Sequence, residues 1–377
     1  MHKEITDARL IVIKIGSSLL IDADGLNTGW LAGMAQDIAA LRANGARVVV
    51  VSSGAVGLGA GQLGLARAAM TLEQSQAAAA NGQIALARGW QEALAGLDIP
   101  IAQILLTIED TEQRRRYLNA RNTIHALLDL GAVPIINEND TVATQELRYG
   151  DNDRLAARVA GMVSADCLLL LSDIDGFYTS NPDTDTQGAA ELIEEVSEMT
   201  AQLRAMAGGS GSTYGSGGMV TKLEAAEIAM RAGCHMVLTT GRPMRPLQAL
   251  QNGGRSTLFR AADNPYGARK NWIAGSLQPS GSLHIDAGAL DALHQGKSLL
   301  PVGIKSLEGQ FERGDCVHII GPQGETVGRG LSAYASTDAL LIIGRPSGEI
   351  SDILGFQGRA EMVHRDDLVM QMGENPL

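Results

Sequence analysis

Short aliphatic runs alternate with longer amphipathic stretches through the first 260 residues, and this alternation restricts the possible folds more than any other feature. The runs are rich in Val, Ile and Leu and end near Gly, Ser, Asn or Asp, which is typical of strands covered on both faces. Strands that alternate with helices form a parallel sheet with helices on both sides. We therefore predict an α/β three-layer sandwich with a mostly parallel sheet. The expected strands are 10–13, 48–51, 99–106, 133–136, 167–171 and 236–238, and the main expected helices are 28–43, 72–95, 119–130, 153–162 and 219–232.

The pattern changes near residue 260. Residues 261–278 have no clear periodicity and are expected to form a linker. Beyond them, short strand-like runs at 316–320 and 339–343 lie between turns that contain Gly and Pro, which indicates a small, mainly β domain. The expected organisation is a larger α/β domain at 1–260, the linker at 261–278, and the β domain at 279–377.

The composition disfavours several classes of protein. The net charge of −12 at pH 7 argues against nucleic acid and anionic membranes as general partners. Cys167, Cys234 and Cys316 lie far apart in apolar contexts, so we expect buried thiols of a cytosolic protein rather than a disulfide framework or a zinc site. No uncharged apolar run approaches the roughly 18 residues of a membrane helix, and the N-terminus lacks a basic region, so we expect neither a membrane span nor a signal peptide.

Two polar clusters follow the predicted strand at 133–136. The first is Asn-Glu-Asn-Asp at 137–140, and the second is Gly-Asp-Asn-Asp at 150–153. In a parallel sheet, ligands bind beyond the carboxyl ends of the strands. An Asp there can face an ammonium group and an Asn can donate to a carboxylate, so the clusters suit a small zwitterion. The alternative is ordinary turn chemistry, because the same residue types dominate turns.

Three loops that contain glycine are candidate anion sites. Lys14 follows an apolar strand, where its burial is costly unless an anion or, in the alternative, a nearby Asp meets its charge. Residues 52–55 (Ser-Ser-Gly-Ala) offer backbone N–H groups and hydroxyls to an oxyanion. The Gly- and Ser-rich residues 208–218 lead into the helix expected at 219–232, with Lys222 in its opening turns. A flexible linker shares that composition, but the helix behind the loop favours phosphate binding.

None of the seven histidines lies in these loops. Phosphoryl transfer to an alcohol usually needs a general base, whereas a carboxylate is already ionised at neutral pH, with a pKa of about 4.3 for a glutamate-like group. A site that offers lysines, glycine-rich backbone amides and polar side chains, but no general base, therefore suits phosphoryl transfer to a carboxylate. Catalysis then consists of positioning and of neutralising charge on the moving phosphoryl group.

Seven motifs stand in order along the chain, at 12–18, 51–55, 118–121, 136–140, 150–153, 171–173 and 215–223. Together they resemble the amino acid kinase family. The segments 300–305 (Leu-Pro-Val-Gly-Ile-Lys) and 311–314 (Phe-Glu-Arg-Gly) resemble the PUA domain that is appended to many of these kinases. Ser stands at positions 52, 172 and 216, where the commoner family pattern has Thr, and the hydroxyl is retained.

The resemblance implies an enzyme that uses ATP and Mg²⁺ to phosphorylate the γ-carboxylate of L-glutamate to γ-glutamyl phosphate. This is the first step of proline biosynthesis, and the resemblance implies feedback inhibition by proline. It implies catalytic roles for Lys14, Lys222 and Asp153 and assigns no metal ligand to the protein. It places glutamate against Ser53, Asp140, Asn152 and Asn137, and ATP against Lys14, Ser172, Asp173, Ser216, Gly217, Gly218, Met219, Val220, Thr221 and Lys222.

The resemblance further implies a cytoplasmic homo-oligomer, a tetramer or a dimer, whose product passes to a glutamyl phosphate reductase. Aspartate, acetylglutamate, carbamate and uridylate kinases share the scaffold and are alternatives, although the paired polar clusters and the β domain favour glutamate. An RNA-binding protein acting through the C-terminal domain is a second alternative. From Gln278 onward, seven Lys and Arg stand against thirteen Asp and Glu, which disfavours RNA. A catalytically silent amino-acid sensor is a third alternative. Such a sensor would not need the two lysines and the acidic residues, yet all of them are present.

Overall fold

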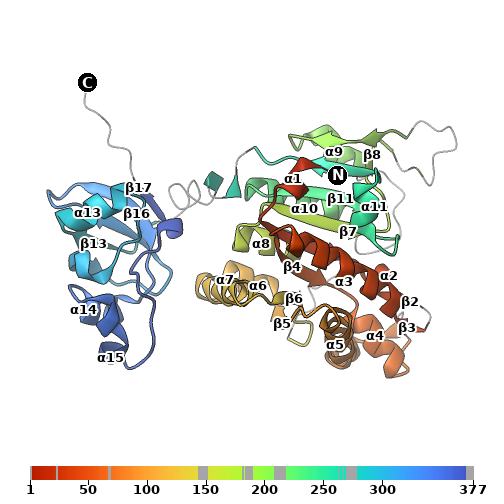
Figure 1. The fold of residues 1–377 in the computed structure, drawn as a ribbon, viewed down its shortest axis with the longest axis horizontal. Helices are drawn as coiled ribbons and strands as arrows, with labels where there is room; N and C mark the ends of the chain where they lie inside the picture. The colour runs from red at the N-terminus through yellow and green to blue at the C-terminus, as the bar shows by residue number, and fades with distance from the viewer. Residues whose placement is uncertain are drawn as a thin grey trace. The chain divides into compact units, whose positions relative to one another are not determined.

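The computed structural model divides the chain into two compact units, Met1–Pro265 and Tyr266–Leu377 (Figure 1). The expected limits of the domains and of the linker at 261–278 stay a prediction, because most of the linker lies outside the described residues. The structure describes residues 2–22, 24–66, 69–142, 152–180, 182, 190–207, 218–262, 264–265, 267–268 and 278–370.

The larger unit is built on an eight-stranded sheet. Its strands, in chain order, are β1 Leu10–Ile15, β4 Arg47–Ser52, β5 Ile101–Leu106, β6 Val133–Glu138, β7 Cys167–Ser172, β10 Glu195–Val196, β11 His235–Thr240 and β12 Ser256–Phe259. Across the sheet they lie in the order β10-β12-β11-β7-β1-β4-β6-β5. The six strands from β11 to β5 are parallel, and β12 is antiparallel to β11. The predicted mostly parallel sheet is confirmed.

The helices of the larger unit follow the predicted alternation. The expected helices at 28–43 and 72–95 are present with those bounds; Asn27 caps the first, and Thr71 and Gln74 form a capping box at the second. The elements outside the main sheet are α1 Lys3–Thr6, α2 Ser17–Leu20, β2 Ile21–Asp22, β3 Gly25–Leu26, α3 Thr28–Ala43, α4 Ala55–Gln62, α5 Leu72–Ala95, α6 Ile108–Glu112, α7 Arg114–Asp129, α8 Asn152–Val163, β8 Phe177–Tyr178, β9 Leu192–Ile193, α9 Ala201–Ala207, α10 Met219–Arg231 and α11 Pro246–Gln251.

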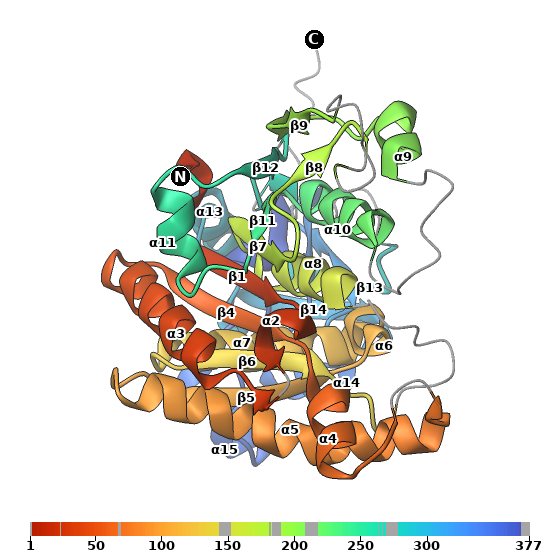
Figure 2. The same ribbon diagram turned by 90° about the vertical axis from the view of Figure 1, so that its right-hand side faces the viewer.

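The sheet is covered on both faces, which makes the unit a three-layer α/β/α sandwich. Successive side chains of a strand point to opposite faces. On β1, Ile11, Ile13 and Ile15 belong to a core cluster that includes buried residues of α3, α5 and α11. Leu10 and Val12 belong to a second cluster, which includes buried residues of α7, α8 and α10. Figure 2 shows α3 on one side of the central strands and α8 with α10 on the other.

The order of the strands creates a switch point beside β1. The chain passes from β1 to β4 on one side and later returns to β7 on the other side. The carboxyl ends of β1, β4, β6 and β7 therefore lie along one edge of the sheet, and ligands of open α/β sheets bind at such an edge. Of the residues expected to carry the chemistry, six lie in the last two positions of these strands or just beyond them: Lys14, Ser53, Asn137, Asp140, Ser172 and Asp173.

The C-terminal unit has its own sheet and core. The strands are β13 Gly281–Ile285, β14 Ile304–Gly309, β15 Cys316–Ile320, β16 Thr326–Leu331 and β17 Leu368–Met370, in the order β14-β13-β15-β16-β17. Only the pair β13 and β15 is parallel among these described strands. The remaining elements are α13 Ala287–His294, η2 Pro301–Gly303, α14 Ser336–Ile342, η3 Ser347–Glu349, α15 Ile350–Leu354 and η4 Arg365–Asp367. The predicted mainly β domain, including its strand at 316–320, is confirmed.

The expected strand at 339–343 is wrong, because residues 336–342 form helix α14. Ala339 and Ile342 are buried, whereas Leu340 and Leu341 are 57% and 58% exposed. That spacing of three between buried residues is helical, and a strand would alternate. Short apolar runs do not distinguish the two by periodicity alone, and here the packing of the C-terminal core decided for the helix.

The crossing of α4 and α5 depends on two glycines. A methyl group at Gly59 would lie 1.7 Å from the carbonyl oxygen of Ala78, and one at Gly82 would lie 1.9 Å from the carbonyl oxygen of Ala55. Backbone atoms cannot move aside as a flexible side chain can, so these glycines allow the two helices to approach closely.

We expect Gly59→Ala to destabilise the protein by about 2–4 kcal/mol, because the added methyl overpacks a backbone contact. Gly61→Ala is the matched control in the same helix, since a methyl group there would meet nothing within 4 Å. It should be neutral or stabilise by up to about 1 kcal/mol through helix propensity. Urea denaturation of both variants checks this, and equal effects would contradict the close approach.

Candidate active site

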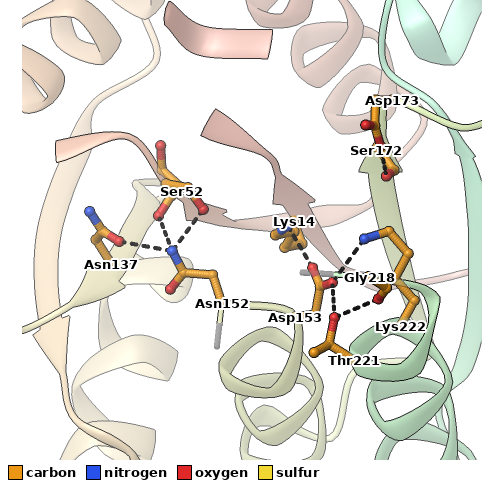
Figure 3. A network of polar contacts seen from close by, with 11 residues as sticks. Lys14, Ser52, Asn137, Asn152, Asp153, Ser172, Asp173, Gly218, Thr221 and Lys222 are labelled. Atoms are coloured by element: carbon orange, nitrogen blue, oxygen red, sulfur yellow. Dashed lines mark hydrogen bonds and ion pairs between the residues drawn. The ribbon is translucent and has the colours of Figure 1, made fainter. Parts of the chain in front are cut away.

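The centre of the site is the carboxylate of Asp153, which pairs with two lysines. Lys14 lies near the end of β1, and by strand alternation its side chain shares the face of Leu10 and Val12, where α8 and α10 pack. Asp153 is in the first turn of α8, and Lys222 is in the first turns of α10. The Nζ of Lys14 lies 2.5 Å from Oδ1 of Asp153, and the Nζ of Lys222 lies 3.3 Å from Oδ2 (Figure 3).

These three charged side chains are buried. The exposed fractions are 9% for Lys14, 1% for Asp153 and 6% for Lys222. Burial by itself would raise the pKa of Asp153, but the charges and hydrogen bonds of the two ammonium groups outweigh it and hold that pKa below its ordinary value. Lys14 therefore does pair with a nearby Asp, which was the alternative to an anion ligand. Two ammonium groups share that one carboxylate, so the three side chains together carry a net positive charge. Because this charge is largely shielded from water, the site favours the binding of an anion.

A group of amides and hydroxyls lies beside the charged trio. Asn152, the neighbour of Asp153, donates from Nδ2 to Ser53 Oγ at 2.7 Å, and its Nδ2 lies 3.4 Å from Asn137 Oδ1. The Oδ1 of Asn152 is buried and has no hydrogen-bond partner among the described residues. Asn137 lies one residue beyond Ile136, which pairs with Val51 of β4, so Asn137 and Ser52 lie at matching positions of two neighbouring strands.

The two serines at the end of β4 have different roles. The Oγ of Ser52 accepts a hydrogen bond from Nε1 of Trp90 at 3.1 Å, and Ser52 is fully buried, whereas the Oγ of Ser53 accepts from Asn152. The expectation that both hydroxyls grip an anion is therefore wrong for Ser52, whose hydroxyl is on the α5 side. Gly54 follows with a φ of 105°, a left-handed conformation that lets the chain turn into α4.

Several residues expected to contact ATP lie on the opposite side of Lys14 from Ser52 of β4, namely Ser172, Asp173, Gly218, Thr221 and Lys222 (Figure 3). Ser172 ends β7, and its Oγ donates to Oδ1 of Asp173 at 2.9 Å. Thr221 Oγ1 donates to the carbonyl of Gly218 at 2.9 Å and lies 3.3 Å from Asp153 Oδ2, so the start of α10 is tied to the charged trio. Met219 is partly buried, and Val220 is 46% exposed. The predicted contacts of Ser216 and Gly217 lie outside the described residues, as does most of the segment 208–218.

Asp140 lies two residues beyond the end of β6, and no hydrogen bond or ion pair involves its carboxyl among the described residues. Burial raises the pKa of Asp140 from 3.8 to about 6. This carboxyl is therefore desolvated, and none of the described cations pairs with it, which is the environment expected for a group that meets a ligand ammonium.

Sequence reasoning did not identify two supporting contacts. Arg154 and Glu224 form an ion pair, with Nη2 at 2.6 Å from Oε2, which joins α8 to α10 beside Asp153 and Lys222. Trp90 supports Ser52 from α5. Neither contact has a signal in the sequence, because the partners come from separate helices and only the packing brings them together.

Two absences apply to the described part of the chain. It contains no group of three or more His, Cys, Asp or Glu side chains that could hold a metal ion. None of its helices is both long and apolar enough to cross a membrane. The three cysteines are free and buried, as expected.

Comparison with known proteins identifies the family. The family model described as the amino acid kinase family matches residues 9–240, and the PUA domain model matches residues 281–354. The chain belongs to the amino acid kinase family. The predicted fold class, including the PUA domain, agrees with this membership.

Several members of the amino acid kinase family are close relatives of this chain. Glutamate 5-kinase of Paramagnetospirillum magneticum is 58% identical over 97% of this chain and 98% of its own length. Glutamate 5-kinase of Agrobacterium fabrum is 57% identical over 98% of this chain and 95% of its own length. Among solved structures, carbamate kinase from Giardia lamblia bound to AMP-PNP matches with a TM-score of 0.48 and 17% identity, over 68% of this chain and 99% of that chain.

The raised pKa of Asp140 predicts a pH-dependent gain in stability from Asp140→Asn. The folded state favours the protonated carboxyl, so the wild type loses stability as the pH rises from about 4 through about 6, where this partly buried carboxyl ionises. The variant has no such group to ionise. We expect it to be more stable than the wild type by about 1–2 kcal/mol at pH 8 and equally stable near pH 4. Urea denaturation at the two pH values measures the difference, and a gain independent of pH would contradict the assignment.

Proposed function

We propose that this chain phosphorylates the γ-carboxylate of L-glutamate with ATP, giving γ-glutamyl phosphate and ADP, as the first step of proline biosynthesis. The observation that carries the proposal is the placement of Lys14 and Lys222 on one carboxylate, directly beside the Asn152–Ser53 pair. The charged trio supplies positive charge for phosphate, and the amide group supplies donors and acceptors for an amino acid. The identity to curated glutamate 5-kinases over nearly the whole chain supports the same substrate.

The amide half of the site suits the amino-acid substrate. Asp140 carries a desolvated carboxyl that an ammonium group would pair with. The buried Oδ1 of Asn152 is an acceptor that a ligand N–H can satisfy, and the Ser53 hydroxyl lies beside it. Asn137 lies within reach of Asn152 and completes the polar surface.

The charged half suits the phosphates of ATP. Lys14 and Lys222 would lie on the phosphoryl group during transfer, while Asp153 holds both ammonium groups in place. The opening turn of α10 adds backbone N–H groups and the positive end of a helix dipole. Ser172 and Asp173, with Gly218 to Thr221, would contact the nucleotide, and we extend this role to Ser216 and Gly217.

The reaction needs no general base. An oxygen of the ionised γ-carboxylate forms a bond to the terminal phosphorus of ATP, the bond from that phosphorus to the bridging oxygen breaks, and ADP leaves with the electron pair. Negative charge spreads over the phosphoryl oxygens in the transition state. Fixed ammonium groups in a site with little water stabilise that charge strongly, because they need no reorganisation during the reaction.

We expect Mg²⁺ to enter with the nucleotide. Mg²⁺ is commonly held by one or two carboxylates together with substrate phosphates. The described residues contain no group of acids that could hold the ion alone, and the carboxylate of Asp153 is already paired with two lysines. The ion would supply further charge neutralisation on the phosphates.

We further propose inhibition by proline, assembly as a homodimer or homotetramer, a cytoplasmic location and transfer of the product to a glutamyl phosphate reductase. Proline shares the ammonium and α-carboxylate that the amide half is suited to recognise, and reduced, buried cysteines fit a reducing compartment. The RNA-binding alternative is disfavoured by the net negative charge of the C-terminal residues.

Lys222→Ala should lower kcat by two to four orders of magnitude with little change in substrate KM, because its charge acts mainly in the transition state. Protein, ATP, Mg²⁺ and glutamate are incubated with hydroxylamine, and glutamyl hydroxamate is measured. Lys3→Ala is the matched control, since that lysine is exposed and its ion pair, with Asp7 at 3.8 Å, joins two exposed side chains of one helix end. It should keep full activity.

The hydroxamate assay and an RNA-binding assay together decide between the alternative functions. No hydroxamate from the wild type, or hydroxamate only with aspartate or acetylglutamate, would contradict the proposal. Protein that retains RNA on filters at physiological salt would support the alternative RNA-binding function. Unchanged hydroxamate formation with millimolar proline would end the proposal of feedback inhibition.

Asp140→Ala should raise the KM for glutamate by at least about tenfold and leave the KM for ATP within about twofold, because a charge-assisted hydrogen bond to the substrate ammonium is lost. Initial rates over a matrix of glutamate and ATP concentrations measure both constants. Parallel increases in both would count against a glutamate contact for Asp140.

A further inference from the structure

Two tryptophans lie in the core on the face of the sheet opposite the lysine cluster. Trp30 is in α3 and Trp90 is in α5, and their exposed fractions are 2% and 0%. Both belong to the cluster that contains Ile11, Ile13 and Ile15, whereas Lys14 lies on the other face of β1. Aromatic residues make up only 3% of the chain, so the core is otherwise aliphatic. Two buried indoles in such a core call for a specific explanation.

The indole of Trp90 supports the amide half of the site. Its Nε1 donates to the Oγ of Ser52 at 3.1 Å, and Ser52 is fully buried at the carboxyl end of β4. The next residue, Ser53, accepts the 2.7 Å hydrogen bond from Asn152. The position of the Ser52 backbone thus sets the position of the Ser53 hydroxyl.

The indole of Trp30 supports the nucleotide half. Its Nε1 donates to the carbonyl oxygen of Gly241 at 2.7 Å, just beyond the end of β11. The N–H of Gly241 in turn donates to the carbonyl oxygen of Ser172 at 2.7 Å. Ser172 and Asp173 form the end of β7 that is proposed to contact ATP. Sheet order places β4 and β7 on either side of β1, and Figure 3 shows Ser52 and Ser172 on either side of Lys14.

A buried indole N–H must have an acceptor, because an unsatisfied donor in an apolar core is costly. Phe or Leu would fill the same apolar volume without that requirement. Each tryptophan therefore adds one directional constraint between a helix of the covering layer and the end of a strand that carries site residues. Such a constraint limits how far the strand end can shift.

We propose that Trp90 and Trp30 are positioning residues for the two halves of the site. Trp90 acts through Ser52 on glutamate binding, and Trp30 acts through Gly241 and Ser172 on ATP binding. This inference rests on the proposed function. Neither indole touches substrate, so their effects appear as changes in substrate affinity transmitted by one hydrogen bond each.

The test is a pair of matched substitutions, Trp90→Phe and Trp30→Phe, each of which removes the N–H and keeps an aromatic ring in the core. We expect Trp90→Phe to raise the KM for glutamate about fivefold with the KM for ATP within about twofold. Trp30→Phe should raise the KM for ATP about fivefold and leave the KM for glutamate within about twofold. Loss of packing alone would lower stability or the amount of active enzyme, but it would not separate the two KM values in opposite directions. Parallel changes in both constants, or none, would overturn the proposal.

Substitutions at the acceptor keep the test decisive if a tryptophan variant fails to fold. Ser52→Ala removes the acceptor and should reproduce the effect on the glutamate KM, whereas Ser52→Thr keeps the hydroxyl and should retain the wild-type value. The double variant Trp90→Phe with Ser52→Ala should be no worse than either single variant, because both remove the same bond. Additive effects, or an unchanged glutamate KM in Ser52→Ala, would refute the role of Trp90.

The control for the underlying activity is the wild-type protein in the hydroxamate assay. If the wild type forms no glutamyl hydroxamate, the proposed function fails. If it does and the two phenylalanine variants show no split between the substrates, only the positioning roles fail.

Discussion

The pairing of one buried carboxylate with two lysines is the interaction on which the site depends. An ammonium group taken out of water is costly unless an anion meets it, and Lys14 and Lys222 are both largely buried. Asp153 compensates for that cost while leaving the trio net positive. The trio therefore keeps a positive charge that a second anion can meet.

The fold delivers this arrangement through the geometry of its layers. Strand alternation directs Lys14 toward the face on which α8 and α10 pack, and both helices begin at the edge where β1 ends. Asn152 and Asp153 are adjacent at the start of α8, yet they serve different halves of the site, because one contacts Ser53 and the other contacts the lysines. The spacing between the two halves of the site is thus set largely by two adjacent residues in the first turn of α8.

The site is maintained at some cost to stability. Asp140 is partly buried without a partner among the described residues, and this burial raises its pKa to about 6. The Oδ1 of Asn152 is likewise a buried acceptor without a described partner. Groups of this kind reduce the stability of the free protein and are satisfied when a ligand binds, which is the usual relation between function and stability in active sites. The aliphatic core and the close crossing of α4 and α5 at Gly59 and Gly82 supply the compensating packing.

The sequence by itself determined the parallel α/β layers, the helices at 28–43 and 72–95, the small β domain and the polar residues at the strand ends, because hydrophobic period and turn chemistry are local properties. The tertiary structure alone decided that residues 336–342 form a helix, that Lys14 and Lys222 share Asp153, and that Ser52 turns to Trp90 while Ser53 faces Asn152. Each of these outcomes depends on which elements pack together. A contact between residues remote in the chain has no periodic signature, so only the packed layers specify it.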